Sequence, residues 1–100
     1  MNKSNNLTFF VLNAACDDYE NIASLQADVE NELNSSIEIQ AIYEVSMQLA
    51  RNGYLDIYIL TDGGNFTGIS PEESEQYCCV KLWFYITGKG RDFIDHFEAK

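Results

Sequence analysis

Two segments in the second half of the chain carry apolar residues at every second position. The first is YLDIYIL at residues 54–60, and the second is CCVKLWFYIT at residues 78–87. A period of two residues is typical of a β-strand and places alternate side chains on one face. The apolar positions are Leu55, Ile57 and Ile59 in the first segment and Val80, Leu82, Phe84 and Ile86 in the second. Because a two-layer domain buries one face of its sheet, other elements should cover this face.

The residues before the first strand have helical periodicity instead. Apolar residues recur every three or four positions and predict helices over roughly residues 5–16, 22–33 and 36–52. The stretch Asn34-Ser35-Ser36 offers side-chain oxygens that can cap the third helix. Asn52-Gly53 should end that helix, because glycine accepts the left-handed conformation that closes a last turn. The first half is therefore expected to form three helices.

The segments around the second strand are expected to be a loop and a final helix. Residues 62–77 contain a Gly-Gly turn signal, the only proline and several glutamates, which predicts a long acidic loop. After the second strand, Thr87 is a plausible helix N-cap, and Gly88 and Gly90 let the chain turn sharply. Phe93, Ile94 and Phe97 would return an apolar face to the core.

The composition indicates one domain with a strong negative charge. A chain of 100 residues with 46% hydrophobic content can bury one core, so residues 1–100 are expected to form a single domain. The formal charge of −10 repels phosphate backbones and anionic lipid. No apolar stretch approaches the roughly 20 residues that span a bilayer. Three cysteines without framework spacing and no visible leader favour reduced thiols in a cytoplasmic protein.

Two motifs resemble winged helix-turn-helix proteins, including small phage-associated and bacterial families. LARNGYL at residues 49–55 looks like a recognition helix that runs into the first wing strand, and YITGKGR at residues 85–91 is similar to the strand exit of those families. The resemblance implies an α+β, winged helix-like fold: three N-terminal helices, a two-stranded β-hairpin with a long wing loop, and a C-terminal helix. It also implies a scaffold that is used to read DNA.

The third helix departs from that family pattern. Winged-helix regulators present basic and polar side chains on this helix and in the wing. With Ala41, Ile42, Val45 and Leu49 placed inward, the wheel turns Gln40, Tyr43 and Met47 outward. Tyrosine and methionine beside carboxylates such as Glu44 suit a protein surface better than a DNA groove, although burial against the first helix is an alternative for Tyr43 and Met47.

The strand flank opposite the apolar face predicts a partner-binding surface. It would display Tyr58, Trp83 and Tyr85 near Lys81, and aromatic side chains of this kind dominate binding energy at interfaces. The alternative is that the first or last helix covers this flank. The predicted partner-binding residues are Tyr58, Trp83, Tyr85, Tyr43, Met47, Glu44, Glu72, Glu73 and Glu75.

The sequence thus favours an acidic protein-interaction module that binds a basic surface on a larger protein. It would act as an inhibitor or adaptor from a phage or another mobile element, with DNA mimicry as one form of this. The alternative is a dimeric winged-helix transcriptional regulator that uses Gln40, Tyr43 and Arg51 in the DNA groove and Lys81, Lys89 and Arg91 on phosphates. A purely structural homodimer subunit is a third interpretation.

No catalytic or metal-binding constellation is recognisable. The clusters Asp17-Asp18-Glu20 and Glu72-Glu73-Glu75 are interpreted as solvated charged surface, with a hard-cation site or a mimic of DNA phosphates as the alternatives. Asp62-Gly63-Gly64-Asn65 does not supply the looped ligand pattern of a calcium site. Cys78 and Cys79 have no basic neighbour that would activate a thiol, and His96 has no identifiable nucleophile. We therefore expect no enzyme, metal ion or cofactor.

Overall fold

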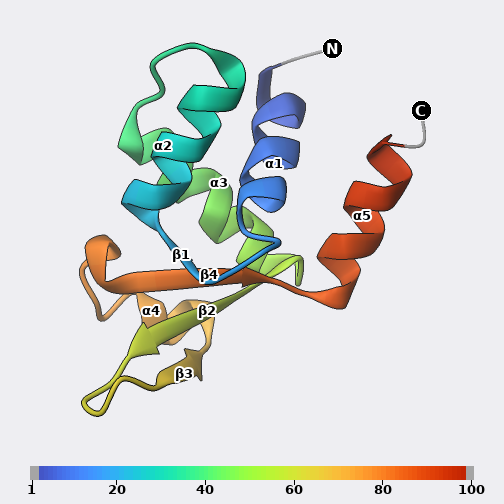
Figure 1. The fold of residues 1–100 in the computed structure, drawn as a ribbon. Helices are drawn as coiled ribbons and strands as arrows, with labels where there is room; N and C mark the ends of the chain where they lie inside the picture. Colours follow the sequence, from blue (N-terminus) through green and yellow to red (C-terminus); the bar gives the residue numbers. More distant parts are fainter. Residues whose placement is uncertain (1–2, 99–100) are drawn as a thin grey trace.

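The structure is a computed structural model that describes residues 3–98, with side chains described for residues 7–96. Five α-helices and four strands form one α+β unit (Figure 1). In chain order the elements are α1 (Lys3–Ala14), β1 (Glu20–Asn21), α2 (Ile22–Leu33), α3 (Ile39–Arg51), β2 (Leu55–Leu60), β3 (Phe66–Ile69), α4 (Pro71–Ser74), a 3-10 turn η1 (Cys79–Lys81), β4 (Leu82–Ile86) and α5 (Gly88–Glu98).

The strands form one antiparallel sheet in the order β1-β4-β2-β3. The last strand in sequence, β4, is therefore central, between β1 and β2. Tyr58 of β2 lies opposite Trp83 of β4, and Trp83 lies opposite Asn21 of β1. This register places the alternating residues Leu55, Ile57, Leu82, Phe84 and Ile86 on one face, and Tyr58, Trp83 and Tyr85 on the other.

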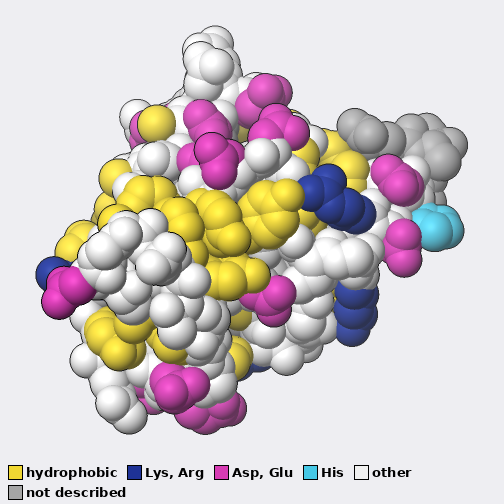
Figure 2. All heavy atoms as spheres, turned by 60° about the horizontal axis from the view of Figure 1, so that its bottom comes forward, with side chains coloured by type: hydrophobic (Ala, Val, Ile, Leu, Met, Phe, Trp, Pro, Cys, Tyr) yellow, Lys and Arg dark blue, Asp and Glu magenta, His cyan; other side chains and the backbone are white. Residues whose placement is uncertain are grey.

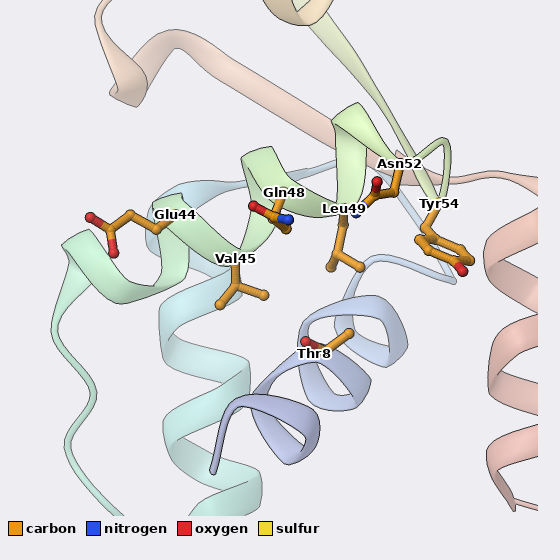
Figure 3. Close-up of a pocket in the computed structure, with 7 residues that line it drawn as sticks. All are labelled: Thr8, Glu44, Val45, Gln48, Leu49, Asn52 and Tyr54. Atoms are coloured by element: carbon orange, nitrogen blue, oxygen red, sulfur yellow. The ribbon is translucent and has the colours of Figure 1, made fainter. Parts of the chain in front are cut away.

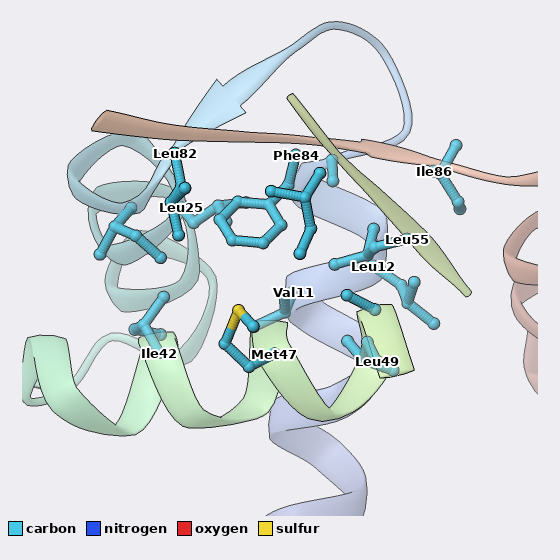
Figure 4. Close-up of a cluster of buried hydrophobic side chains, with 14 of the residues drawn as sticks. Val11, Leu12, Leu25, Ile42, Met47, Leu49, Leu55, Leu82, Phe84 and Ile86 are labelled. Atoms are coloured by element: carbon cyan, nitrogen blue, oxygen red, sulfur yellow. The ribbon is translucent and has the colours of Figure 1, made fainter. Parts of the chain in front are cut away.

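Helices α1, α2 and α3 cover the apolar face of the sheet (Figure 1). The core lies between the two layers, and Phe84 is its largest fully buried side chain. Figure 4 shows Phe84 and Leu82 from β4 meeting side chains from α2 and α3. Further buried members are Val11, Leu12, Ile22, Leu25, Val29, Ile42, Leu49, Leu55, Ile57 and Ile86. The period-two prediction is correct for this face except at Val80. This residue is 63% exposed because it lies in the 3-10 turn η1, which replaces the expected first residues of the strand.

The end of α3 follows its sequence signal. Gly53 has φ of +83°, the left-handed conformation that closes the helix. The amide of Tyr54 donates to the Leu49 carbonyl at 2.9 Å, and that of Gly53 donates to the Ala50 carbonyl at 3.1 Å. These two bonds satisfy carbonyls that the helix end would leave unpaired, and they direct the chain straight into β2.

Helix α5 starts as predicted, but only one of its two glycines is required. The Thr87 hydroxyl accepts from the Gly90 amide at 3.0 Å, which is the expected N-cap bond. The same hydroxyl donates to the Gly53 carbonyl at 2.7 Å, so the first turn of α5 rests on the backbone at the end of α3. A Cβ at Gly90 would collide with the Tyr54 carbonyl oxygen, whereas one at Gly88 would meet open space. The side chain of Phe97, expected to face the core, lies outside the described side chains.

The main error in the sequence-based fold concerns the sheet. The expected two-stranded hairpin is a four-stranded sheet, because the short β1 pairs with β4 and because residues 62–77 are not one loop. They contain β3, which pairs with β2, and the one-turn helix α4, which packs on α3. Ser70 and Glu73 form a capping box for α4, with the Glu73 amide donating to Ser70 Oγ at 3.1 Å.

The predicted cap of α3 is also wrong. Helix α3 begins at Ile39 with Glu38 as its N-cap, and no side chain caps it. Side chains of α2 hold the preceding loop instead: Glu30 Oε2 accepts from the Ile37 amide and Gln26 Nε2 donates to the Ile37 carbonyl, both at 2.8 Å. Asn34 instead closes α2, in the left-handed conformation. Within the described residues, no helix combines the length and the apolar character needed to cross a bilayer.

Candidate interaction surface

Five aromatic side chains gather on the sheet face that is opposite the core. Tyr58 comes from β2, Phe66 from β3, and Trp83 and Tyr85 from β4, while Tyr19 comes from the loop between α1 and β1. We call this set the aromatic face: Tyr19, Tyr58, Phe66, Trp83 and Tyr85. The Tyr19 ring is stacked on Phe66 with a centroid distance of 4.0 Å, and it lies 5.0 Å from Tyr58 and 5.2 Å from Tyr85. The Phe66 ring lies edge-on to Trp83 at 5.3 Å.

The aromatic face is uncovered by any helix of the described chain. The three core helices lie on the other side of the sheet, and α4 packs on α3, where Ser74 Oγ lies 3.9 Å from Met47 Sδ. Figure 2 shows a continuous hydrophobic band across this side of the molecule, with acidic side chains above and below it. The five rings are half-buried because they pack on one another, and Leu60 beside them on β2 is 50% exposed. Of the two arrangements expected from the sequence, an exposed flank or a flank covered by the first or last helix, the structure has the exposed one.

Carboxylates lie around the aromatic face. Burial, followed by the charge of Asp56, raises the pKa of Tyr58. Burial also raises the pKa of Glu20, and the nearby Asp28, Asp18 and Asp17 raise it further. This second effect shows that the acidic residues on either side of Tyr19 form one negative region with Asp28.

Arg91 of α5 closes one end of the aromatic face. Its Nη2 donates to the Tyr85 hydroxyl at 3.0 Å and to the Cys16 carbonyl at 2.9 Å, and the guanidinium carbon lies 5.8 Å from the centre of the Tyr85 ring. Burial and then the charge of Asp17 raise the pKa of the Cys16 thiol, which disfavours its thiolate form. Cys78 and Cys79 are also free thiols, and they lie at the start of η1, not in a strand.

The predicted contacts on α3 do not join this surface. Met47 is not outward: it is 2% exposed and points from α3 into the core (Figure 4). The helical-wheel prediction for Met47 is wrong because α4 and the sheet bury a wider arc of α3 than the first helix alone would cover. Tyr43 is half-buried against the core, while Gln40 and Glu44 are exposed and hydrogen-bonded to each other at 3.1 Å.

The predicted acidic contacts lie on and beside α4. Glu72, Glu73 and Glu75 are all exposed. Glu73 is engaged in the capping box of α4, and Glu75 lies 3.8 Å from Arg51 in an exposed ion pair. They follow β3 in the chain, and α4 packs on α3.

The basic residues of the DNA-binding alternative are dispersed, and most are engaged within the chain. Arg51 pairs with Glu75, and Arg91 is bonded to Tyr85 and Cys16. Lys89 Nζ donates to the Asn52 carbonyl at 2.8 Å and lies 4.7 Å from the centre of the Tyr54 ring. Lys81 is exposed at the start of β4.

A groove of about 350 Å³ lies on a different side of the molecule, between α1 and α3 (Figure 3). Its lining residues are Thr8, Glu44, Val45, Gln48, Leu49, Asn52 and Tyr54. Among the lining residues that the structure describes, Glu44 is the one carboxylate, and no cysteine, histidine or cationic side chain accompanies it. Over the described residues, no three His, Cys, Asp or Glu side chains are grouped as a metal ion would require.

Sequence reasoning found three of the five residues of the aromatic face and missed Tyr19 and Phe66. Both lie in segments that were assigned to loops, so no strand period placed them. The available signals were the FTGI run at residues 66–69, whose phenylalanine and isoleucine favour strands, and a tyrosine isolated among acidic residues. Comparison of this chain with protein-family models, with curated proteins and with solved structures finds no match.

Proposed function

We propose that this protein is an acidic protein-interaction module that binds a larger basic partner through the aromatic face. The observation that carries the proposal is the cluster of five aromatic side chains on a sheet face with no helix over it. Tyrosine and tryptophan are enriched among the residues that dominate binding energy, since they bury a large area at low entropic cost. The mutual packing of the rings adds to this, because the face is already ordered before the partner arrives.

The charge supports a partner with a basic surface. The formal charge is −10, and carboxylates such as Asp56, Asp17 and Asp18 flank the aromatic face. Complementary charge speeds the encounter and disfavours acidic competitors. A protein that normally binds nucleic acid has such a surface, so an inhibitor that presents carboxylates in place of phosphates is the form of this proposal that accounts for the charge most directly. Tyr58, Trp83 and Tyr85 would be the anchors.

The scaffold itself is proposed to be winged helix-like, as the order of the helices and the antiparallel pairing of β2 with β4 support. A DNA-reading use of that scaffold has weaker support. Of the four basic side chains that the structure describes, Arg51, Lys89 and Arg91 bind other groups of the chain. The four lie apart from one another and form no continuous basic surface. Phosphate contacts need free Lys and Arg side chains in register with the duplex.

The test compares Trp83→Ala and Tyr58→Ala with Tyr77→Ala, which removes an exposed aromatic outside the aromatic face. Partner capture from a cell lysate and oligomeric state by light scattering are measured after circular dichroism has shown each variant folded. We expect the first two variants to lose capture and Tyr77→Ala to retain it. Capture unchanged in both aromatic-face variants would rule out this surface.

A second measurement separates the regulator. Fluorescence anisotropy of labelled duplex DNA, titrated with the protein at low and then physiological salt, should show no binding. Binding that weakens linearly with the logarithm of salt concentration would instead favour the DNA-binding alternative.

A further inference from the structure

Strand β3 is an edge of the sheet with an open hydrogen-bonding side. It pairs with β2 on one side and is the last strand of the order β1-β4-β2-β3 on the other. Thr67 and Gly68 in its middle are exposed. Across the described residues, no backbone hydrogen bond of Phe66–Ile69 is made outside the pairing with β2.

The register shows which backbone groups point outward. In an antiparallel pair, hydrogen-bonded and non-hydrogen-bonded positions alternate. The Thr61 amide donates to the Asn65 carbonyl at 2.8 Å, so the next hydrogen-bonded position joins Ile59 to Thr67. The N–H and C=O groups of Phe66 and Gly68 lie at the alternate positions and therefore point away from β2.

Apart from its short length of four residues, this edge lacks the devices that normally protect an edge strand. Natural edges are blocked by lysine, proline, a bulge or a covering element. The FTGI sequence of β3 contains no charge and no proline, its four-residue register is regular, and its extensive contacts are with β2. An unprotected edge is a template for another strand.

The chemistry on either side of β3 defines the strand that fits. Phe66 belongs to the aromatic face, so an added strand would extend that face with apolar side chains beside it. On the opposite side, Ile69 packs against the core, and the exposed Glu72 and Glu73 follow it in α4. Asp62 at the preceding turn adds a further carboxylate at the other end.

We infer that β3 is a docking edge for an extended segment of the basic partner in which apolar and Lys or Arg residues alternate. The apolar residues would lie beside Phe66, and the basic ones would face the carboxylates of α4. A second copy of this chain fits poorly, because pairing two β3 edges would bring together two chains of charge −10. This inference rests on the proposed function, because both require a basic protein partner.

The test uses fluorescein-labelled peptides of about six residues, the usual length of a strand. One alternates lysine and valine, one alternates glutamate and valine, and one has the lysines and valines in separate blocks. Anisotropy should rise to saturation for the alternating lysine peptide alone. Equal binding of the block peptide would reduce the interaction to charge and overturn the inference.

Two substitutions at one position isolate the backbone. Gly68→Ala keeps the outward N–H, and its Cβ would make only ordinary contacts, to Tyr58 Cε1 at 3.7 Å, Tyr58 Cδ1 at 3.9 Å and the Ile57 carbonyl oxygen at 4.0 Å. Gly68→Pro removes that N–H without breaking a bond to β2. We expect roughly tenfold weaker peptide binding for proline and less than about twofold change for alanine.

If Gly68→Pro fails to fold, amide hydrogen exchange on the wild-type protein decides. The amides of Phe66 and Gly68 should exchange quickly in the free protein and slowly with the alternating peptide, and no slowing would overturn the inference. A dimer that Gly68→Pro abolishes would assign the edge to a second copy and also overturn it. Loss of lysate capture by Trp83→Ala with unchanged peptide binding by Gly68→Pro would leave the proposed function intact and remove this inference alone.

Discussion

The contact between the start of α5 and the end of α3 yields a sharp prediction for a matched pair of glycines. Gly88 and Gly90 are two residues apart in the first turn of one helix. A Cβ at Gly90 would collide with the Tyr54 carbonyl oxygen and lie 2.6 Å from Ile86 Cγ1, whereas a Cβ at Gly88 would have no atom within 4 Å. We therefore expect Gly90→Ala to destabilise the protein and Gly88→Ala to stabilise it.

The magnitudes follow from the two environments. Forcing an extra carbon into a packed site costs about 1–3 kcal/mol, and the collision at Gly90 involves backbone that cannot turn aside. The better helix propensity of alanine recovers at most about 1 kcal/mol, so Gly90→Ala should cost about 2 kcal/mol. Gly88→Ala should add about 0.4–1 kcal/mol, mainly by restricting the unfolded chain.

Urea unfolding followed by the fluorescence of Trp83, the only tryptophan, measures both variants. In thermal unfolding, the difference in free energy between Gly88→Ala and Gly90→Ala should separate the midpoints of the two variants by roughly 10–20 °C for a domain of this size. A shift of both variants in the same direction, or a Gly90→Ala variant as stable as the wild type, would refute the close approach of α5 to Tyr54.

Three further predictions concern single side chains. The hydroxyl of Ser46 is buried without a hydrogen-bond partner among the described atoms, so Ser46→Ala should raise the free energy of unfolding by about 1 kcal/mol in urea titrations, and a loss would contradict this. Burial and nearby carboxylates raise the pKa of Glu20 when the protein folds, so its charged form opposes folding. Glu20→Gln should therefore stabilise the protein at neutral pH, and the gain should shrink as pH falls through the raised folded pKa and vanish below the ordinary glutamate pKa of 4.5; a pH-independent gain in thermal scans would exclude this cause. Phe84→Ala should cost roughly 3–5 kcal/mol, visible as a large loss of the urea midpoint, because it empties the centre of the core.

The sequence predicted those parts of the fold that rest on long periodic segments. The periods of α1, α2, α3, β2 and β4 are set by burial against one shared core, so each segment carries its own signal. Local backbone chemistry made the ends at Gly53 and Thr87 predictable in the same way.

Short elements were missed because their pairing decides them. The two-residue strand β1 has no period and exists because β4 lies beside it. Strand β3 contains a glycine and is only four residues long, and it forms because β2 offers it a free edge. Met47 shows the same limit, since its burial depends on α4, an element that was itself assigned to a loop.

The candidate site could be predicted from the sequence to the same extent as the fold. The alternation in β2 and β4 places Tyr58, Trp83 and Tyr85 on one face, and the structure brings them together as expected. Tyr19 and Phe66 complete the cluster from segments without a period, so only the three-dimensional arrangement joins them to it. Whether helices cover the face is likewise a property of packing that no local pattern encodes.

The central place of β4 has a consequence for biosynthesis. Strand β4 pairs with both β1 and β2 and is the only link between them, so the sheet lacks this central strand until residue 86 has been synthesised. Before that, the emerging helices can cover their apolar faces only with one another and with β2, and pairings between residues this distant in sequence close slowly. A chain that stops after residue 76 should therefore stay unfolded on the ribosome, and in the complete chain the aromatic face should be among the last surfaces to form.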